Sequence, residues 1–316
     1  MSNSTSPALY AEALYAKSQV YIAKGLRAKA KRDLEEYQLW AFLALELLAK
    51  SSLSNIHPAL IADPSHYQSL FAACGYQLSP DIKTITAKTL FPRLGHVSRR
   101  FDFRVQGFCE QLSLRRNSEI HSGESPFSGM KAEAWEKKYW HAVEVILEIQ
   151  QKGLEQWLGA EDSKAPKQIL SDAKAAIQMA VQTRISHTRE DFDAAHKNQE
   201  ARAKFIKEHE CQRAYEYWKE FDPNMEGFEL NKCPSCGAKG ILGGVLWHEK
   251  VLSDEIDEND PLVEYVESMY AAEEFLCKVC GLHLVGTKEI EASPLPEEFY
   301  KTKEREREFE PDYGND

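Results

Sequence analysis

Hydrophobic residues recur at steps of three and four positions through the first half of the chain, which is the spacing of amphipathic helices. The segment ALYAEALYAKSQVYIAKGLRAKA follows this pattern, and the next helix, from about Asp33 to Ser52, is apolar on nearly every side. A helix that is apolar all round belongs in the interior of a protein. We therefore expect a helical bundle with this second helix at its centre.

Further stretches complete the expected bundle. A helix is predicted over 97–116, and a long amphipathic helix from about Lys131 to Leu158. Between them the sequence HSGESPFSG requires a loop, because Gly, Ser and Pro favour turns. The bundle is expected to occupy residues 1–160.

The hydrophobic pattern changes after this bundle. Residues 161–225 are more polar but still helical in pattern, which suits an extended connector or a dimerisation arm. From residue 226 to 292, short β-like runs surround paired cysteines and enclose an acidic insertion. Residues 293–316 are expected to form an acidic C-terminal tail.

Two CxxC pairs lie in the C-terminal region, in KCPSCGAKG and FLCKVCGLH, and a glycine follows each pair. Two residues between cysteines let a tight turn aim both thiolates at one ion, and glycine gives the backbone freedom that the turn requires. Two such pairs fit a tetrahedral zinc ribbon, and four cysteines leave no open coordination position, so we expect structural Zn²⁺. The expected ligands are Cys233, Cys236, Cys277 and Cys280.

Other uses of this region are less consistent with the sequence. A redox site of the thioredoxin type needs a single CxxC pair in a βαβ setting, which is missing here. His248 and His283 could substitute as ligands, although we expect an ordinary surface or core role for each. Cysteines placed mostly in CxxC pairs favour a reducing compartment, and no signal or membrane segment is visible in the sequence, so a cytoplasmic protein is expected.

Charge is distributed unevenly along the chain. The net charge of −11 argues at first against a nucleic-acid partner, because phosphate binding depends on clustered Lys and Arg. Basic residues nevertheless crowd between Lys83 and Arg116, and a second run, Lys17–Arg32, contains no acid. Solvated helix faces would explain such runs about equally well. The residues expected to contact RNA are Arg99, Arg100, Arg104 and Arg115.

A polar run, LRRNSEIHSG, ends the helix predicted over 97–116. In it Arg116 is followed directly by Asn117 and, after four intervening residues, by His121. On a helix Asn117 and His121 share a face, whereas Arg116 lies about 140° away. The plain interpretation is that Arg116 and His121 cap the helix and pair with nearby acids such as Glu119.

Arginine followed by histidine in a helical bundle resembles the HEPN superfamily, whose motif is Arg, four to six residues and His, commonly with a polar residue after the Arg. The resemblance covers roughly residues 7–158 and includes EYQLWAFLALELLAKSSL, which is similar to the buried core helix of HEPN domains. Arg189 to His196 and Arg202 to His209 also fit the bare pattern, but no bundle helix follows them, so we interpret both as coincidences.

The resemblance implies a metal-independent endoribonuclease that leaves 2′,3′-cyclic phosphate ends. Histidine suits proton transfer near neutral pH, and a guanidinium suits the phosphate oxygens of the transition state. The resemblance also implies a dimer, because HEPN nucleases act as dimers. Two copies of Arg116, Asn117 and His121 would then form one composite site.

The sequence thus predicts a mainly α fold: a HEPN-like helical bundle followed by a helical connector and a small β-containing zinc ribbon. The expected function is RNA cleavage in defence or toxin-like regulation by a homodimer, with an antitoxin or regulatory protein as a further partner and no membrane. One alternative is a non-catalytic HEPN and zinc-ribbon module that binds RNA or a protein. Another is a structural protein whose ribbon docks it to a larger assembly.

Overall fold

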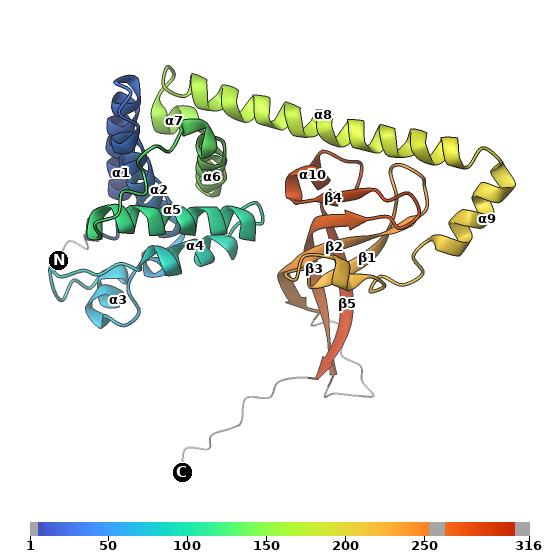
Figure 1. The fold of residues 1–316 in the computed structure, drawn as a ribbon. Coiled ribbons are helices and arrows are strands. Elements are labelled where there is room, and N and C mark those ends of the chain that lie inside the picture. Colours follow the sequence, from blue (N-terminus) through green and yellow to red (C-terminus); the bar gives the residue numbers. More distant parts are fainter. Residues whose placement is uncertain (1–5, 253–262, 307–316) are drawn as a thin grey trace, which may run out of the picture. The chain divides into compact units, whose positions relative to one another are not determined.

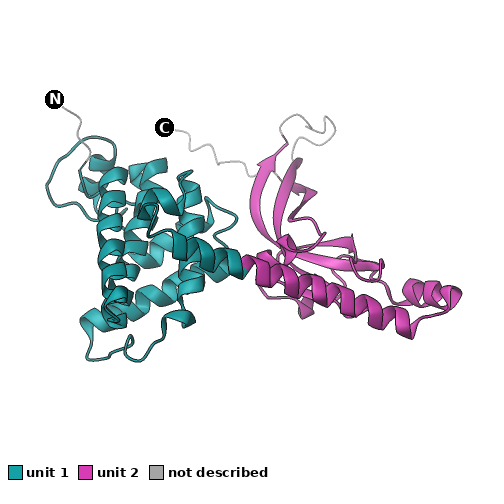
Figure 2. Cartoon of the chain, turned by 90° about the horizontal axis from the view of Figure 1, so that it is seen from above, with its two compact units in different colours: residues 1–173 teal, residues 174–316 magenta. Residues whose placement is uncertain are grey.

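The computed structural model of the protein describes residues 6–252 and 263–306, so most of the acidic insertion and the last ten residues lie outside the described part. The chain divides into two compact units, residues 1–173 and 174–316 (Figure 2). The first consists of helices, and the second combines helices with one antiparallel sheet. A mainly α fold with a small β region is therefore confirmed.

Two long helices pack along each other in the first unit, and the second of them lies at its centre (Figure 1). Between α1 (Ala11–Ala30) and α2 (Leu34–Ile56) the chain turns tightly, with Arg32 in the left-handed region at a φ of 63°. Asp33 then caps α2, because its carboxylate accepts a hydrogen bond from the backbone N–H of Glu36. Buried residues cover a wide face of α2, and other positions such as Leu39, Glu46 and Leu47 are half-buried, as its apolar sequence predicts.

Shorter helices pack around this centre. They are η1 (Pro58–Leu60), α3 (Tyr67–Ala73), α4 (Ala87–Gly95), α5 (Phe103–His121), η2 (Ala132–Ala134), α6 (Glu136–Ile149) and α7 (Leu154–Leu158). The helix predicted over 97–116 begins later, because the Asp102 carboxylate caps α5 by accepting two backbone N–H groups. The helix predicted over 131–158 is interrupted where Gln151 takes a left-handed conformation with a φ of 56°.

The second unit places helices beside a five-stranded sheet. The helices are α8 (Lys164–Ala195), which begins in the first unit, α9 (Gln199–His209), η3 (Trp218–Glu220) and α10 (Thr287–Glu291). The strands are β1 (Gly227–Lys232), β2 (Lys239–Val251), β3 (Val263–Leu276), β4 (His283–Val285) and β5 (Glu298–Glu306), all paired antiparallel in the order β1-β2-β3-β4, with β5 also on β3. Part of the segment expected as a tail thus belongs to the sheet.

The later part of α8 packs within the second unit. Val181, Ile185 and Phe192 belong to the same buried cluster as residues of the sheet. Arg184 donates to both carboxylate oxygens of Glu289 in α10, at 2.7 and 3.0 Å. Throughout residues 6–252 and 263–306, no helix is both long and apolar enough to cross a membrane.

Candidate functional sites

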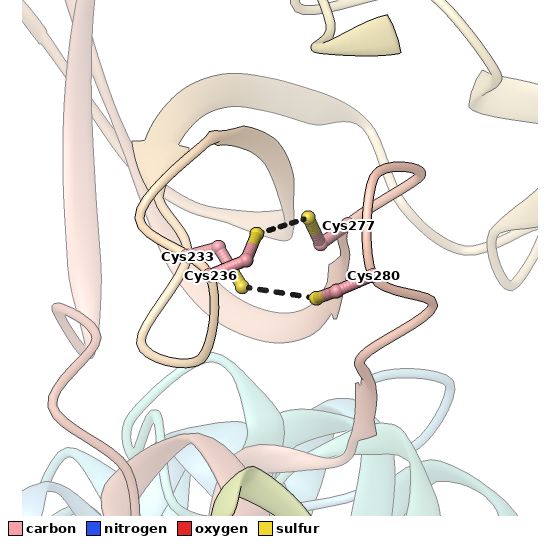
Figure 3. Close-up of side chains that lie close together, drawn as sticks. All are labelled: Cys233, Cys236, Cys277 and Cys280. Carbon is pink, nitrogen blue, oxygen red and sulfur yellow. Dashed lines mark hydrogen bonds between the residues drawn. The ribbon is translucent and has the colours of Figure 1, made fainter. Parts of the chain in front are cut away.

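The four cysteines lie in two turns of the sheet that face each other (Figure 3). Cys233 and Cys236 stand between β1 and β2, and Cys277 and Cys280 stand between β3 and β4. In the antiparallel register of β2 and β3, Ile241 pairs with Leu276, which places the ends of these strands side by side. The sheet therefore brings together two turns that are far apart in sequence.

Both turns have the same backbone geometry. In each, the N–H of the first cysteine donates to the carbonyl five residues later, and the N–H of the following glycine donates back to the carbonyl of the first cysteine. Gly237 and Gly281 have φ values of 78° and 77°, a conformation that side chains disfavour. The glycines predicted from the sequence are thus required by the turn. The bonds are Cys233 to Ala238 (2.8 Å), Gly237 to Cys233 (3.0 Å), Cys277 to Leu282 (2.9 Å) and Gly281 to Cys277 (2.9 Å).

The four sulfur atoms are spaced for a metal ion. Each cross-turn pair, Cys233 with Cys280 and Cys236 with Cys277, has its Sγ atoms 3.6 Å apart, and all four lie within 4.8 Å of one another. A disulfide would need about 2.05 Å. A tetrahedral ion with metal–sulfur bonds of about 2.3 Å would put its ligands about 3.8 Å apart. The cluster can therefore hold one tetrahedral metal ion.

The thiols of this cluster differ in acidity. Hydrogen bonding from the Cys233 thiol holds the pKa of Cys236 and of Cys280 below the ordinary value. Hydrogen bonds among the four side chains raise the pKa of Cys233 and of Cys277. Two of the four positions thus favour the thiolate within the protein itself. A bound cation would favour it at all four, since the thiolate is the form that ligates metals.

No histidine joins the cysteines among the described residues. The Nε2 atom of His283 lies 2.6 Å from the Glu274 carboxylate, and His248 is exposed on β2. Arg189, from one of the two coincidental Arg-to-His patterns, donates to the carbonyls of Pro234 and Ser235 at 2.6 and 3.2 Å. Its side chain thus supports the first cysteine turn.

The polar run forms the last turns of α5. Along this helix Val105, Cys109 and Leu112 are buried, and Arg116 continues the same four-three-four spacing. Its guanidinium forms an ion pair with Glu46 in the central helix α2, and these two side chains are 16% and 18% exposed. Arg116 therefore points toward the bundle, and a small part of its side chain stays exposed.

Glu46 has a second cationic neighbour. The Nζ atom of Lys50, one turn further along α2, lies 3.1 Å from the Glu46 carboxylate. The same ammonium donates to the Thr84 hydroxyl at 3.2 Å. The end of α5 thus meets a half-buried group of two cations and one carboxylate, which we call the Glu46 cluster: Glu46, Lys50 and Arg116.

The other two motif residues lie on a different side of α5. Asn117 and His121 are exposed, and no described residue makes a hydrogen bond or ion pair with either side chain. The acid proposed as a capping partner, Glu119, instead accepts the backbone N–H of Phe127 at 3.4 Å. Within one chain, therefore, Arg116 and His121 do not converge.

The arginines expected to contact RNA are held by their own chain to different degrees. Arg100 donates to both carboxylate oxygens of Glu148, at 2.5 and 2.6 Å. Arg104 lies 4.3 Å from the Phe103 ring centre, and Arg99 is half-buried. Arg115, on the end of α5, is exposed and donates to the Met130 sulfur at 3.0 Å.

Sequence reasoning did not identify Glu46 and Lys50 as part of this site. A signal was present, because Glu46 is an isolated acid within the apolar stretch LWAFLALELLA. Carboxylates are rarely buried without a partner, so such a residue indicates a cation on a neighbouring element. The partner itself, Arg116, lies 70 positions away.

Comparisons with protein-family models, with curated proteins and with solved structures found no match to this chain.

Proposed function

We propose that the protein is a metal-independent endoribonuclease with a structural Zn²⁺ in its second unit. The observation that carries the proposal is the ion pair between Glu46 and Arg116, together with the HEPN resemblance of the bundle. A guanidinium has five N–H donors in a planar fork, so binding to one carboxylate leaves donors for a phosphate. Glu46 would fix the guanidinium before RNA binds, which reduces the entropy lost in the reaction.

The active site is composite in this proposal. Because Arg116 and His121 point to different sides of α5, one chain offers each group in a different direction. A two-fold symmetric dimer that pairs the ends of two α5 helices would place His121 of the partner subunit beside Arg116. Asn117 shares the face of His121 and would orient its imidazole.

The chemistry needs only these groups. One His121 removes the proton from a ribose 2′-OH, and the freed oxygen attacks the adjacent phosphorus. The bond from phosphorus to the 5′-oxygen breaks, and the partner's His121 donates the proton that this oxygen takes up. The products are a 2′,3′-cyclic phosphate and a 5′-hydroxyl. Arg116 stabilises the negative charge of the transition state.

Cleavage of a single-stranded RNA without added divalent ions tests this function. Replacing His121 with alanine should reduce the rate about 10²–10⁴-fold, the range for loss of a general acid or base. His187→Ala is the matched control, because His187 is also an exposed histidine on a helix. An unchanged rate in His121→Ala, or an absolute need for Mg²⁺, would contradict the mechanism.

Zn²⁺ is the proposed ion for the cysteine cluster. Four cysteine side chains at tetrahedral spacing form a common structural zinc site, and the two turns have the form of a zinc ribbon. Elemental analysis of the purified protein should find about one zinc per chain. Absence of zinc, or a disulfide within either pair, would refute this assignment.

The second candidate function is a non-catalytic module that binds RNA or a protein. It is favoured by the engagement of Arg116 with Glu46 and of Arg100 with Glu148, since both contacts would serve a structural role equally well. Cleavage distinguishes the two functions. The module would bind RNA without cutting it, and His121→Ala would leave that binding unchanged. The HEPN resemblance extends the first proposal to defence or toxin-like cleavage in the cytoplasm under control of an antitoxin or regulatory protein.

A further inference from the structure

Three large aromatic side chains within four consecutive residues are exposed in the second unit. Tyr215, Tyr217 and Trp218 lie between α9 and β1, and they are 54%, 39% and 54% exposed. Single exposed aromatic residues are ordinary, but a group of large rings on a surface indicates a binding site.

A lysine ammonium lies over each of the three rings. The distances to the ring centres are 4.8 Å from Lys301 to Tyr215, 4.9 Å from Lys278 to Tyr217 and 5.6 Å from Lys219 to Trp218. These lysines come from β5, from the second cysteine turn and from η3. We call these six residues the aromatic–lysine surface.

Contacts with β1 and with the second cysteine turn hold parts of this surface in place. The ring of Tyr215 packs edge-on against Phe228 of β1, with 5.4 Å between ring centres. Glu220 pairs with Lys278 at 2.6 Å, which ties η3 to the cysteine turn. Tyr217 has a φ of 69°, a left-handed conformation that is rare for a bulky residue and persists only where the surroundings enforce it. The rings of Tyr215 and Tyr217 are therefore held by neighbouring parts of the second unit.

The three lysines of this surface lie among acidic side chains, with Glu216, Glu220 and Asp222 close by in the sequence. Between residues 213 and 220 there are two basic and two acidic side chains, and Lys278 and Lys301 add two further cations. Glu216 already accepts the backbone N–H of Gln212 at 2.9 Å. Among the described residues, Lys278 is the one lysine of the three that pairs with an acid, so Lys219 and Lys301 are the cations available to a phosphate.

We propose that the aromatic–lysine surface binds single-stranded RNA. Unpaired bases would stack on the rings, and the ammonium groups would contact the phosphates that link them. Stacked aromatic rings beside cations are the usual means of binding single strands without sequence preference. Protein interfaces, in contrast, are depleted in lysine. The choice of RNA over DNA rests on the proposed function, whereas the binding itself does not require Arg116 or His121.

The test uses the full-length protein and a fluorescent 2′-O-methyl oligouridine of about 12 nucleotides, close to the length that such surfaces cover. Lacking a 2′-OH, this probe cannot be cut by the proposed mechanism, so binding is measured by fluorescence anisotropy independently of cleavage. Trp218→Ala should weaken binding about tenfold, the loss expected for one stacked base. Trp247→Ala is the matched control: Trp247 is 38% exposed in the same unit, and no described lysine lies over its ring.

A second variant tests the phosphate contacts. Lys301→Ala should lower the slope of log affinity against log salt by about one, the effect of losing one phosphate contact. No binding to the oligonucleotide, equal losses in Trp218→Ala and Trp247→Ala, or equal affinity for a duplex would each overturn the proposal. If the oligonucleotide does not bind at all, a protein becomes the expected ligand of this surface. Binding without cleavage of natural RNA would support this surface and refute the endoribonuclease.

Discussion

The cysteine cluster and the end of α5 bring their residues together in opposite ways. In the first, four side chains from two turns converge within 4.8 Å inside a single chain. In the second, residues only five positions apart diverge, with Arg116 bound to Glu46 and His121 exposed. Closeness in sequence thus says little about closeness in space.

The difference shows what each site needs in order to work. A closed tetrahedral ligand set needs no further group from outside, which is the condition for a structural ion. The end of α5 offers cation and imidazole in different directions, so a shared phosphate requires a second surface. In our proposal that surface is another copy of the same helix end.

Among the changes predicted for the two sites, loss of one cysteine should have the largest effect on folding. Cys277→Ser should abolish zinc binding and unfold the sheet, because structural zinc sites contribute about 10–16 kcal/mol of apparent binding energy to folding. The first unit should keep its helical circular dichroism, since the cluster lies in the second. Limited proteolysis together with elemental analysis measures both outcomes, and Cys74→Ser, at an exposed cysteine outside the cluster, is the control. A Cys277→Ser protein with an intact sheet would show that the ion is dispensable.

Mixing two inactive variants should separate a shared site from a site within one chain. Arg116→Ala and His121→Ala are each expected to lose at least about 10²-fold in cleavage rate. In a mixed dimer, the remaining Arg116 and His121 lie on different chains. Activity should therefore return in part after the two are unfolded and refolded together, because the mixed dimer keeps one Arg116 and one of the two His121 side chains. The rate on the same RNA should lie above that of either variant and below that of the parent. If the mixture stays as inactive as its components, the Arg116 of one chain does not act with the His121 of the other.

Loss of the Arg116 side chain should also have a moderate effect on stability. Arg116→Ala leaves Glu46 half-buried with Lys50 as its remaining cation, which should cost about 1–3 kcal/mol in the free energy of unfolding. Arg116→Lys keeps the charge and should cost less, while still losing the planar fork for phosphate. Urea unfolding monitored by circular dichroism gives the free energy of unfolding of both variants and of the parent. Equal stability of Arg116→Ala and the parent would mean that the ion pair contributes nothing.

The smallest effect is expected at His121. Its side chain is exposed and makes no hydrogen bond to a described residue, so His121→Ala should change the free energy of unfolding by less than about 0.5 kcal/mol. The same urea titration provides the value. A loss above 1.5 kcal/mol would assign His121 a structural role and would weaken any conclusion drawn from its loss of activity.

Local patterns predicted some elements well. The CxxC spacing and the glycine after each pair define a turn that hardly depends on the rest of the chain, so both turns follow from the sequence. The central position of α2 follows from its apolar residues in the same way. The inward direction of Arg116 could also have been predicted, because it continues the spacing of Val105, Cys109 and Leu112.

Contacts between residues that are far apart in the sequence could not be predicted. Glu46 meets Arg116 through the packing of α2 on α5, which no local pattern encodes. The strand β5 was expected within an acidic tail, because it is rich in charged residues and Phe299 is its one buried residue, so no hydrophobic alternation marks it in the sequence. The break at Gln151 depends on a single left-handed residue that is not glycine, and such residues are rare.

The register between β2 and β3 has a consequence for how the protein is made. Forty residues separate Cys236 from Cys277, so at about 5–20 residues per second the second pair leaves the ribosome about 2–8 seconds after the first. During that interval the first pair can offer only two sulfur ligands. The complete site arises when β3 pairs with β2, and a slip of two residues would displace one pair by about 7 Å. In our proposal, binding of the ion therefore requires that β2 and β3 pair in the correct register while the sheet forms.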